Sequence, residues 1–230
     1  MNKAGQIHTY VGYLGRLPYE EQLHWRQFNE APKSPISDRA YKTDFEGSWA
    51  EEYDPLPSLK RQLRELNEDG CEWWKLKDES LLSQTNYPLT ESQDEWEEEI
   101  LNLDKLIVEG LAEKQIRKVA KALEVMQEIK RKEKQRKAKF RGLKLLEECL
   151  VGAGVSEDQA YLLLSPFHEV HHYRSVFKGH TKGSEAKKQR KKVLKSFGTW
   201  KAHFTDLCRR CDESIREISR TFLATPAESK

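Results

Sequence analysis

Helical periodicity from Ser92 onward constrains the fold of this chain more than any other feature of the sequence. Apolar residues recur there at steps of three and four positions on a strongly charged stretch, beginning with Trp96, Ile100, Leu103 and Ile107. This spacing is the pattern of an amphipathic helix, which buries one stripe and exposes the rest. Residues 91–225 contain no alternation of apolar and polar residues long enough for a half-buried strand. We therefore predict an all-α fold.

The periodic segments predict an antiparallel helical bundle in residues 91–225. Its helices are expected near residues 92–127, 139–151, 156–179 and 198–222, with a short basic helix before the last. Gly110 is a candidate break in the first helix. Pro166 either kinks the third helix or restarts it, because proline suits a first helical position. The tail at residues 226–230 is expected to fray.

Residues 1–90 have a different texture and predict a separate region that is irregular and mostly helical. They hold all eight prolines except Pro166 and Pro226. Short helices are expected from Tyr19 to Phe28, after a cap at Ser37, and from Leu59 to Leu66. We interpret the tryptophans as packing groups and not as ligand-stacking groups, because large aromatic side chains dominate burial in small cores.

The formal net charge of +2 conceals an asymmetry between two parts of the chain. Residues 1–127 carry a net charge of −9 and residues 128–230 carry +11. Residues 130–139 contain seven basic side chains, which form either a solvated helix face or a mobile basic segment. A basic half attracts polyanions, because lysine and arginine displace condensed counterions from phosphates. A solvated charged surface is the simpler alternative for any single run.

Neither a membrane span nor a signal peptide is indicated. No stretch approaches the roughly 18 apolar residues of a span, and the start, Met-Asn-Lys-Ala-Gly-Gln, lacks a charged-then-apolar layout. We therefore expect a soluble, cytoplasmic protein without a membrane partner. The cysteines are too sparse for a disulfide scaffold and predict reduced thiols. The pair Cys208 and Cys211 has no second pair to complete a zinc site.

Residues 168–172 read His-Glu-Val-His-His and match the H-E-x-x-H pattern of zinc metallopeptidases. In that pattern two imidazoles one helical turn apart bind zinc, and the glutamate activates water. The extension that would supply a third histidine is missing, because Ser175 and Lys178 stand at its positions. A zinc metallopeptidase that uses His168 and His172 is one alternative, and solvated histidines beside a basic site are the simpler one.

Arg174 and His180 follow on the same segment with five residues between them, and Gly179 lets the chain leave helical geometry before the histidine. This pair resembles the R-x(4-6)-H motif of the HEPN superfamily (higher eukaryotes and prokaryotes nucleotide-binding domains). Members are four- or five-helix bundles with the motif near the end of the third core helix, and catalytic members are metal-independent endoribonucleases. The resemblance covers roughly residues 91–225. Ser175 departs from it, because many catalytic members have asparagine or aspartate there.

The resemblance implies that Arg174 and His180 are catalytic and that no metal or other cofactor takes part. A guanidinium stays charged and can hold a phosphate through two parallel hydrogen bonds, whereas an imidazole titrates near neutrality and moves protons. Ser175, His172 and Lys178 are expected to support the pair. The expected contacts to the RNA backbone are Lys182, Lys187, Lys188, Arg190, Lys191 and Lys192.

We therefore predict a metal-independent endoribonuclease, a toxin or an antiphage-defence effector, that cleaves RNA through attack by the 2′-hydroxyl. The resemblance implies a homodimer with a composite active site, and an antitoxin or defence-system protein as a further partner. The first alternative is a non-catalytic HEPN-like module that dimerises or binds nucleotide, in which Arg174 and His180 are ordinary surface residues. The second alternative is the zinc metallopeptidase.

Overall fold

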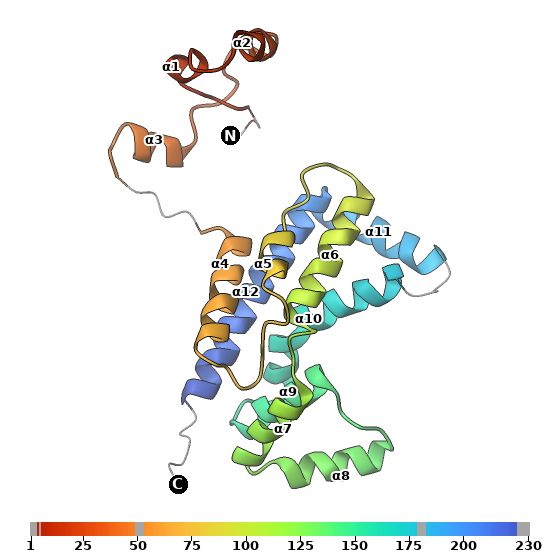
Figure 1. Ribbon diagram of the computed structural model, residues 1–230. Helices are drawn as coiled ribbons and strands as arrows, with labels where there is room; N and C mark the ends of the chain where they lie inside the picture. The colour runs from red at the N-terminus through yellow and green to blue at the C-terminus, as the bar shows by residue number, and fades with distance from the viewer. Residues whose placement is uncertain (1–3, 5, 49–52, 179–182, 225–230) are drawn as a thin grey trace. The chain divides into compact units, whose positions relative to one another are not determined.

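The structure, a computed structural model, describes residues 4, 6–48, 53–178 and 183–224. Within these ranges the chain forms twelve helices and no strand (Figure 1), so the predicted all-α fold is confirmed. None of these helices is long and apolar enough to cross a membrane. The predicted frayed tail at residues 226–230 lies outside the described ranges.

The chain divides into two units, Met1–Tyr53 (unit 1) and Asp54–Lys230 (unit 2). The division falls closer to the start of the chain than the boundary predicted at residue 90. The physical reason is that helix α4 (Pro55–Glu68) packs along helix α12 (Trp200–Ala224). Residues 54–90 therefore belong to the helical bundle.

Unit 1 contains three short helices and no buried side chain among the residues described there. The helices are α1 (Val11–Leu14), α2 (Tyr19–Arg26) and α3 (Asp38–Asp44). Ser37 caps α3, because its Oγ accepts a hydrogen bond from the amide of Ala40 at 3.3 Å. The helices predicted after Pro18 and Ser37 are therefore confirmed.

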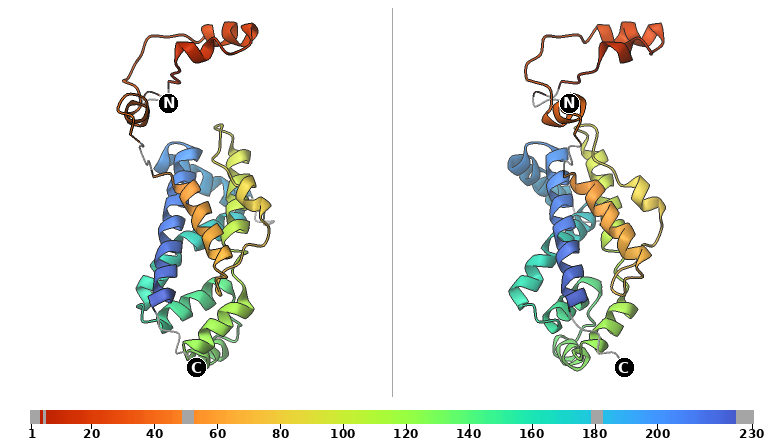
Figure 2. Two further views of the ribbon diagram at one scale, coloured as in Figure 1. Left: turned by 60° about the vertical axis from the view of Figure 1, so that its left-hand side comes forward. Right: turned by 90° about the vertical axis from the view of Figure 1, so that its left-hand side faces the viewer.

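Unit 2 is built from the remaining helices and holds the hydrophobic core. Besides α4 and α12 they are α5 (Ser80–Gln84), α6 (Gln93–Ile107), α7 (Glu113–Ala122), α8 (Met126–Arg136), α9 (Gly142–Gly152), α10 (Glu157–Lys178) and α11 (Gly183–Phe197). Helix α10 packs against α6, α9 and α12 and runs antiparallel to α6 and α12 (Figure 1). Helix α4 lies along α12 in both views of Figure 2 and runs parallel to it. The predicted antiparallel arrangement thus describes α10 and its neighbours.

Trp96 on α6 lies at the centre of an aromatic contact between α6, α10 and α12. It is fully buried, and its ring stacks on that of Trp200 with 4.4 Å between centroids. Trp73 and Trp74 are also buried. The interpretation of the tryptophans as packing groups is confirmed for these residues, whereas Trp25 in unit 1 is exposed.

The helix predicted over residues 92–127 is divided at the candidate break, Gly110, into α6 and α7, and α8 begins before its predicted end. The carbonyl of Gly110 accepts a hydrogen bond from the amide of Lys75 at 3.0 Å. A Cβ at Gly110 would lie 2.2 Å from Nε1 of Trp74, so only glycine fits this close approach. The break places Glu109 beside α10.

The basic run at residues 130–139 lies at the end of helix α8. Residues 130–136 of the basic run belong to helix α8, and residues 137–139 lie in the loop after it, so most of the run is a helix face.

All four cysteines are free. Cys149, Cys208 and Cys211 are buried in the core of unit 2, where burial raises the pKa of their thiols. They are packing groups.

Candidate functional site

Helix α10 carries the H-E-x-x-H residues and the arginine of the second motif, and directs Glu169 and Arg174 to different neighbours. Its first turn is acidic, which suits the positive end of the helix dipole, and it continues through Pro166 to Lys178. Glu169 and Arg174 are five residues apart, so they lie on different faces of the helix. Glu169 and Arg174 are therefore the centres of two separate polar clusters, one toward α12 and one toward α6.

The first cluster is centred on the guanidinium of Arg174. Its Nη1 lies 2.6 Å from Oδ2 of Asp104 on α6 and 2.6 Å from Oε1 of Glu109. The Asp104 side chain is fully buried, whereas 36% of the Arg174 side chain is exposed. Burial alone would lower the pKa of Arg174, but the two carboxylates outweigh it and raise that pKa. The guanidinium is therefore charged and held in one orientation.

His171 lies one helical turn before Arg174 and shares its carboxylate. Its Nδ1 is 3.0 Å from Oδ1 of Asp104, and 49% of its side chain is exposed. A carboxylate at Nδ1 fixes the orientation of an imidazole and leaves Nε2 available for proton transfer. Asp104 thus holds an arginine and a histidine next to each other, with both heads accessible to solvent.

Asp104, Glu109 and His171 are members of this cluster that the sequence prediction missed. A signal for Asp104 was present, because it stands four residues after Ile100 at the edge of the apolar stripe of α6, where a carboxylate needs a partner once buried. The signal for His171 was its three-residue step to Arg174, which places both on one helix face. Nothing local indicated Glu109, whose position depends on the break before α7.

The predicted supporting residues lie on α10, as Arg174 and His171 of this cluster do. The Oγ of Ser175 donates a hydrogen bond to the carbonyl of His171 at 3.0 Å and is exposed. His172 is also exposed, and Lys178 is the last residue of α10. Two predicted residues lie outside the described ranges, namely His180 and Lys182.

Most of the predicted RNA contacts lie on α11, which follows α10. Arg190 differs from the others, because its Nε lies 2.6 Å from Oε1 of Glu97 and its guanidinium lies over the ring of Phe177. It fixes α11 to α6 and to the end of α10. The exposed lysines of this set are Lys187, Lys188, Lys191 and Lys192.

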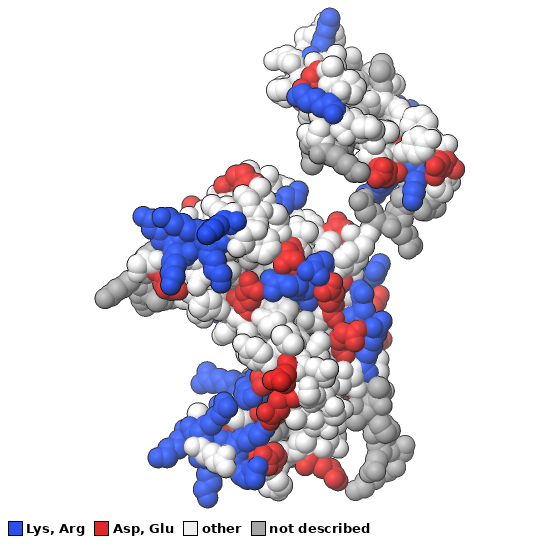
Figure 3. Space-filling model, turned by 180° about the vertical axis from the view of Figure 1, so that it is seen from behind, with Lys and Arg blue, Asp and Glu red and all other residues white. Residues whose placement is uncertain are grey.

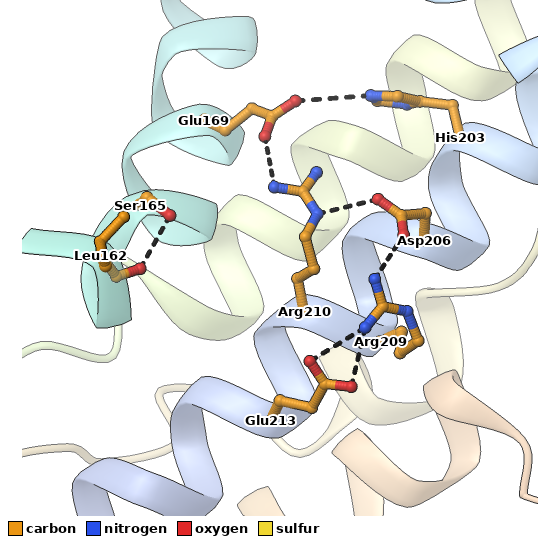
Figure 4. Close-up of polar contacts among 8 residues, drawn as sticks. All are labelled: Leu162, Ser165, Glu169, His203, Asp206, Arg209, Arg210 and Glu213. Carbon is orange, nitrogen blue, oxygen red and sulfur yellow. Dashed lines mark hydrogen bonds and ion pairs between the residues drawn. The ribbon is translucent and has the colours of Figure 1, made fainter. Parts of the chain in front are cut away.

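The second cluster is centred on Glu169 (Figure 4). Its Oε2 lies 2.7 Å from Nη1 of Arg210, and Nε of Arg210 lies 2.8 Å from Oδ2 of Asp206. Burial alone would raise the pKa of Glu169, but His203 and Arg210 outweigh it and lower that pKa to about 2. Glu169 is therefore ionised and engaged, and it cannot act as a general base, which needs a pKa near the working pH.

His203 on α12 completes the second cluster and is fully buried. Trp96 donates a hydrogen bond from Nε1 to Nδ1 of His203 at 3.2 Å. An indole nitrogen only donates, so Nδ1 is unprotonated and the neutral ring carries its proton on Nε2. That nitrogen faces Oε1 of Glu169 at 3.7 Å (Figure 4). The second cluster therefore joins α6, α10 and α12 and is structural.

The histidines of the zinc alternative do not gather a ligand set. Burial lowers the pKa of His168, and His172 is exposed. In the described part of the chain, no group of three or more His, Cys, Asp or Glu side chains could hold a metal ion. Because Glu169 is bound to Arg210 as well, this geometry opposes the metallopeptidase alternative.

A groove of about 470 Å³ runs between α10 and α12 beside the second cluster. Leu162, Ser165, Arg210 and Glu213 are among its lining residues (Figure 4). Its charged groups Arg210 and Glu213 already have partners, as in the ion pair between Arg209 and Glu213 at 2.8 Å. These two groups of the groove are therefore engaged in ion pairs.

Comparisons with known proteins add no family to this geometry. No protein-family model, no curated protein and no solved structure matches the chain. The chemistry of the Arg174 cluster is therefore the basis for assigning a function.

Proposed function

We propose that this chain is a metal-independent endoribonuclease of HEPN type, a toxin or antiphage-defence effector, with its site at the Arg174 cluster. The observation that carries the proposal is the shared carboxylate: buried Asp104 binds the guanidinium of Arg174 and the imidazole of His171. Both heads are partly exposed, so a phosphate can reach them. RNA is the substrate, and a second copy of the chain forms the composite site.

Arg174 holds the phosphate in this proposal. Both of its ion pairs with described carboxylates use Nη1, which leaves Nε and Nη2 for two parallel hydrogen bonds. A guanidinium already fixed by carboxylates needs little reorganisation as charge develops on the phosphate. Its role is to stabilise the pentacovalent phosphate.

The proton transfers need one base and one acid. The 2′-oxygen attacks phosphorus while the base takes its proton, and the acid protonates the 5′-oxygen as its bond to phosphorus breaks. The products are a 2′,3′-cyclic phosphate and a 5′-hydroxyl. His180 is the imidazole that the sequence predicts, and His171, oriented by Asp104, supplies the second one.

The test is cleavage of a mixed RNA pool by the purified chain in excess chelator. The wild type is expected to cleave, and Arg174→Ala and His180→Ala are expected to lose activity. Arg209→Ala is the matched control, because this arginine is exposed on α12 and belongs to the second cluster. Cleavage that persists in both site variants contradicts the proposal. Loss of RNA cleavage on chelation contradicts the metal-independent mechanism, whereas the zinc alternative predicts cleavage of peptides that chelation and His168→Ala both abolish.

A second candidate is the non-catalytic HEPN-like module. One observation favours it: two carboxylates, Asp104 and Glu109, surround the single charge of Arg174, so the arginine could serve only to join α6 to α10. The substitution Glu109→Gln separates the two functions. If the cluster binds phosphate, removing this negative charge increases RNA affinity, whereas a structural ion pair predicts lower stability and unchanged RNA affinity.

A further inference from the structure

Two segments of unit 2, at α8 and at α11, present basic side chains that form no ion pair with a described carboxylate. The α8 patch comprises Lys130, Lys134, Arg136, Lys137 and Lys139, and the α11 patch comprises Lys187, Lys188, Lys191, Lys192 and Lys195. All are exposed, and none forms an ion pair with a described carboxylate. Figure 3 shows both patches on one face of unit 2, separated by a surface of mixed character. So much uncompensated charge favours a polyanionic ligand.

The two patches are anchored at opposite ends of α10. Lys132 on α8 lies 2.7 Å from Oε2 of Glu148 and 3.4 Å from Oε1 of Glu157, the first residue of α10. Arg190 on α11 lies over Phe177, in the last turn of α10. A helix of 22 residues is about 33 Å long at 1.5 Å per residue. A ligand that touches both patches is therefore a polymer, longer than a nucleotide.

The patches offer charge without a stacking surface. Helix α8 contains no aromatic residue, and the aromatic residue of α11, Phe197, packs against the ring of His203. Proteins that bind single strands stack the bases on aromatic side chains, whereas double-stranded RNA is contacted through its phosphates and 2′-hydroxyls. We infer that the two patches bind a double-stranded segment of RNA along α10. The inference rests on the proposed function for the choice of RNA over DNA and for the fate of that RNA: unpaired nucleotides leaving the duplex at the α11 end meet Arg174.

The experiment measures binding of 2′-O-methyl RNA as a duplex of about 20 base pairs and as a single strand. This RNA has no 2′-hydroxyl to attack and keeps the phosphates that the basic patches would contact. Lys130→Gln/Lys134→Gln is compared with Arg61→Gln/Arg64→Gln, two exposed arginines on α4 that give the same change in charge. The wild type is expected to prefer the duplex. The α8 variant is expected to bind it more weakly, with a salt slope reduced by about 2. The α4 variant is expected to bind like the wild type.

Three results overturn the inference: equal or tighter binding of the single strand, equal behaviour of the α8 and α4 variants, or tighter binding to anionic lipid vesicles than to the duplex. Thermal unfolding of each variant shows whether it is folded. Cleavage of a short unpaired oligoribonucleotide is expected to be unchanged in the α8 variant, because that RNA does not reach α8. A chain that binds the duplex but cuts no RNA therefore contradicts the proposed function and leaves this inference standing.

Discussion

Two polar clusters on the same helix, one at Glu169 and one at Arg174, differ in what they leave accessible. At Glu169 the carboxylate is bound by Arg210 and faced by a fully buried histidine, His203. At Arg174 the carboxylate of Asp104 is buried, and the guanidinium and imidazole that it binds are partly exposed. The first arrangement joins helices. In the second, a buried carboxylate holds a guanidinium and an imidazole that are both accessible to solvent.

The difference teaches that the specificity of a motif does not decide the structural role of its residues. The H-E-x-x-H pattern supplies Glu169 to a structural network, while Arg174, the first residue of the loosely defined pair, is held by a buried carboxylate and keeps its guanidinium partly exposed. A buried partner that fixes a side chain and leaves its head free is typical of catalytic and binding groups. The following variants test whether the two clusters are as different as this comparison says.

The largest expected effect is that of Arg174→Lys. Lysine keeps the positive charge that buried Asp104 requires but lacks the planar fork for a bidentate phosphate contact. We expect the single-turnover rate of RNA cleavage to fall by about 10²–10³-fold, with little change in the melting temperature. A cleavage rate close to that of the wild type contradicts a phosphate-holding role for Arg174.

The next effect is that of His171→Gln, with His172→Gln as its matched control. Removing an imidazole that moves a proton is expected to reduce the cleavage rate by about 10²-fold and to flatten the pH–rate profile. The sequence predicted a supporting role for His172, but its side chain is exposed and its described ring contact is with Tyr173 and not with Asp104, so its variant is expected to stay close to the wild type. Equal cleavage rates for the two variants would contradict a catalytic role for His171 and for the contact between Asp104 and His171.

A smaller effect, on stability and not on catalysis, is expected for Glu169→Gln. Arg210 loses its charged partner, and the free energy of unfolding is expected to fall by about 1–3 kcal/mol. Glu213→Gln is the control, because its ion pair with Arg209 is exposed and contributes less than about 1 kcal/mol. Urea denaturation measures both. A Glu169→Gln chain that folds normally but no longer cleaves RNA would indicate that the active site lies at the second cluster.

The smallest expected effect is a change with pH in the difference in unfolding free energy between the wild type and Glu169→Gln. The pKa of Glu169 in the folded chain is lowered to about 2, from an ordinary value of 4.5. Its contribution to stability is therefore present above pH 4.5 and is lost as the pH falls toward 2. The gap between wild type and Glu169→Gln in urea denaturation should narrow over that range. A gap that stays constant down to pH 3 contradicts the role given to the ionised carboxylate.

Much of the fold could be predicted because its signals are local. Apolar spacing and caps indicated α9, α10 and α12 to within a few residues, and proline and serine marked the starts of α2 and α3. The break between α6 and α7 could not be predicted as certain, because it depends on Trp74 packing against Gly110. The packing of α4 on α12 brings together residues more than 100 positions apart and has no local signal.

Only part of the candidate site could be predicted, because only part of it has a local signal in the sequence. Arg174, on which the candidate site is centred, was singled out by residue type and spacing. Asp104, which gives the cluster its form, lies far from Arg174 in the sequence and meets it only because α6 and α10 pack together. A charged residue beside an apolar stripe was its sole signal, and such a residue is more often solvated than buried.

The chemistry of the cut ends tests the central claim most directly. RNA cleaved by the wild-type chain in excess chelator is analysed by mass spectrometry of the fragments, beside the Arg174→Lys reaction. Attack by the 2′-hydroxyl predicts a 2′,3′-cyclic phosphate on one fragment and a 5′-hydroxyl on the other, with both signals lost in the variant. Fragments that carry 5′-phosphate and 3′-hydroxyl ends, or cyclic phosphate ends that persist undiminished in Arg174→Lys, contradict the assignment of this cluster as the active site.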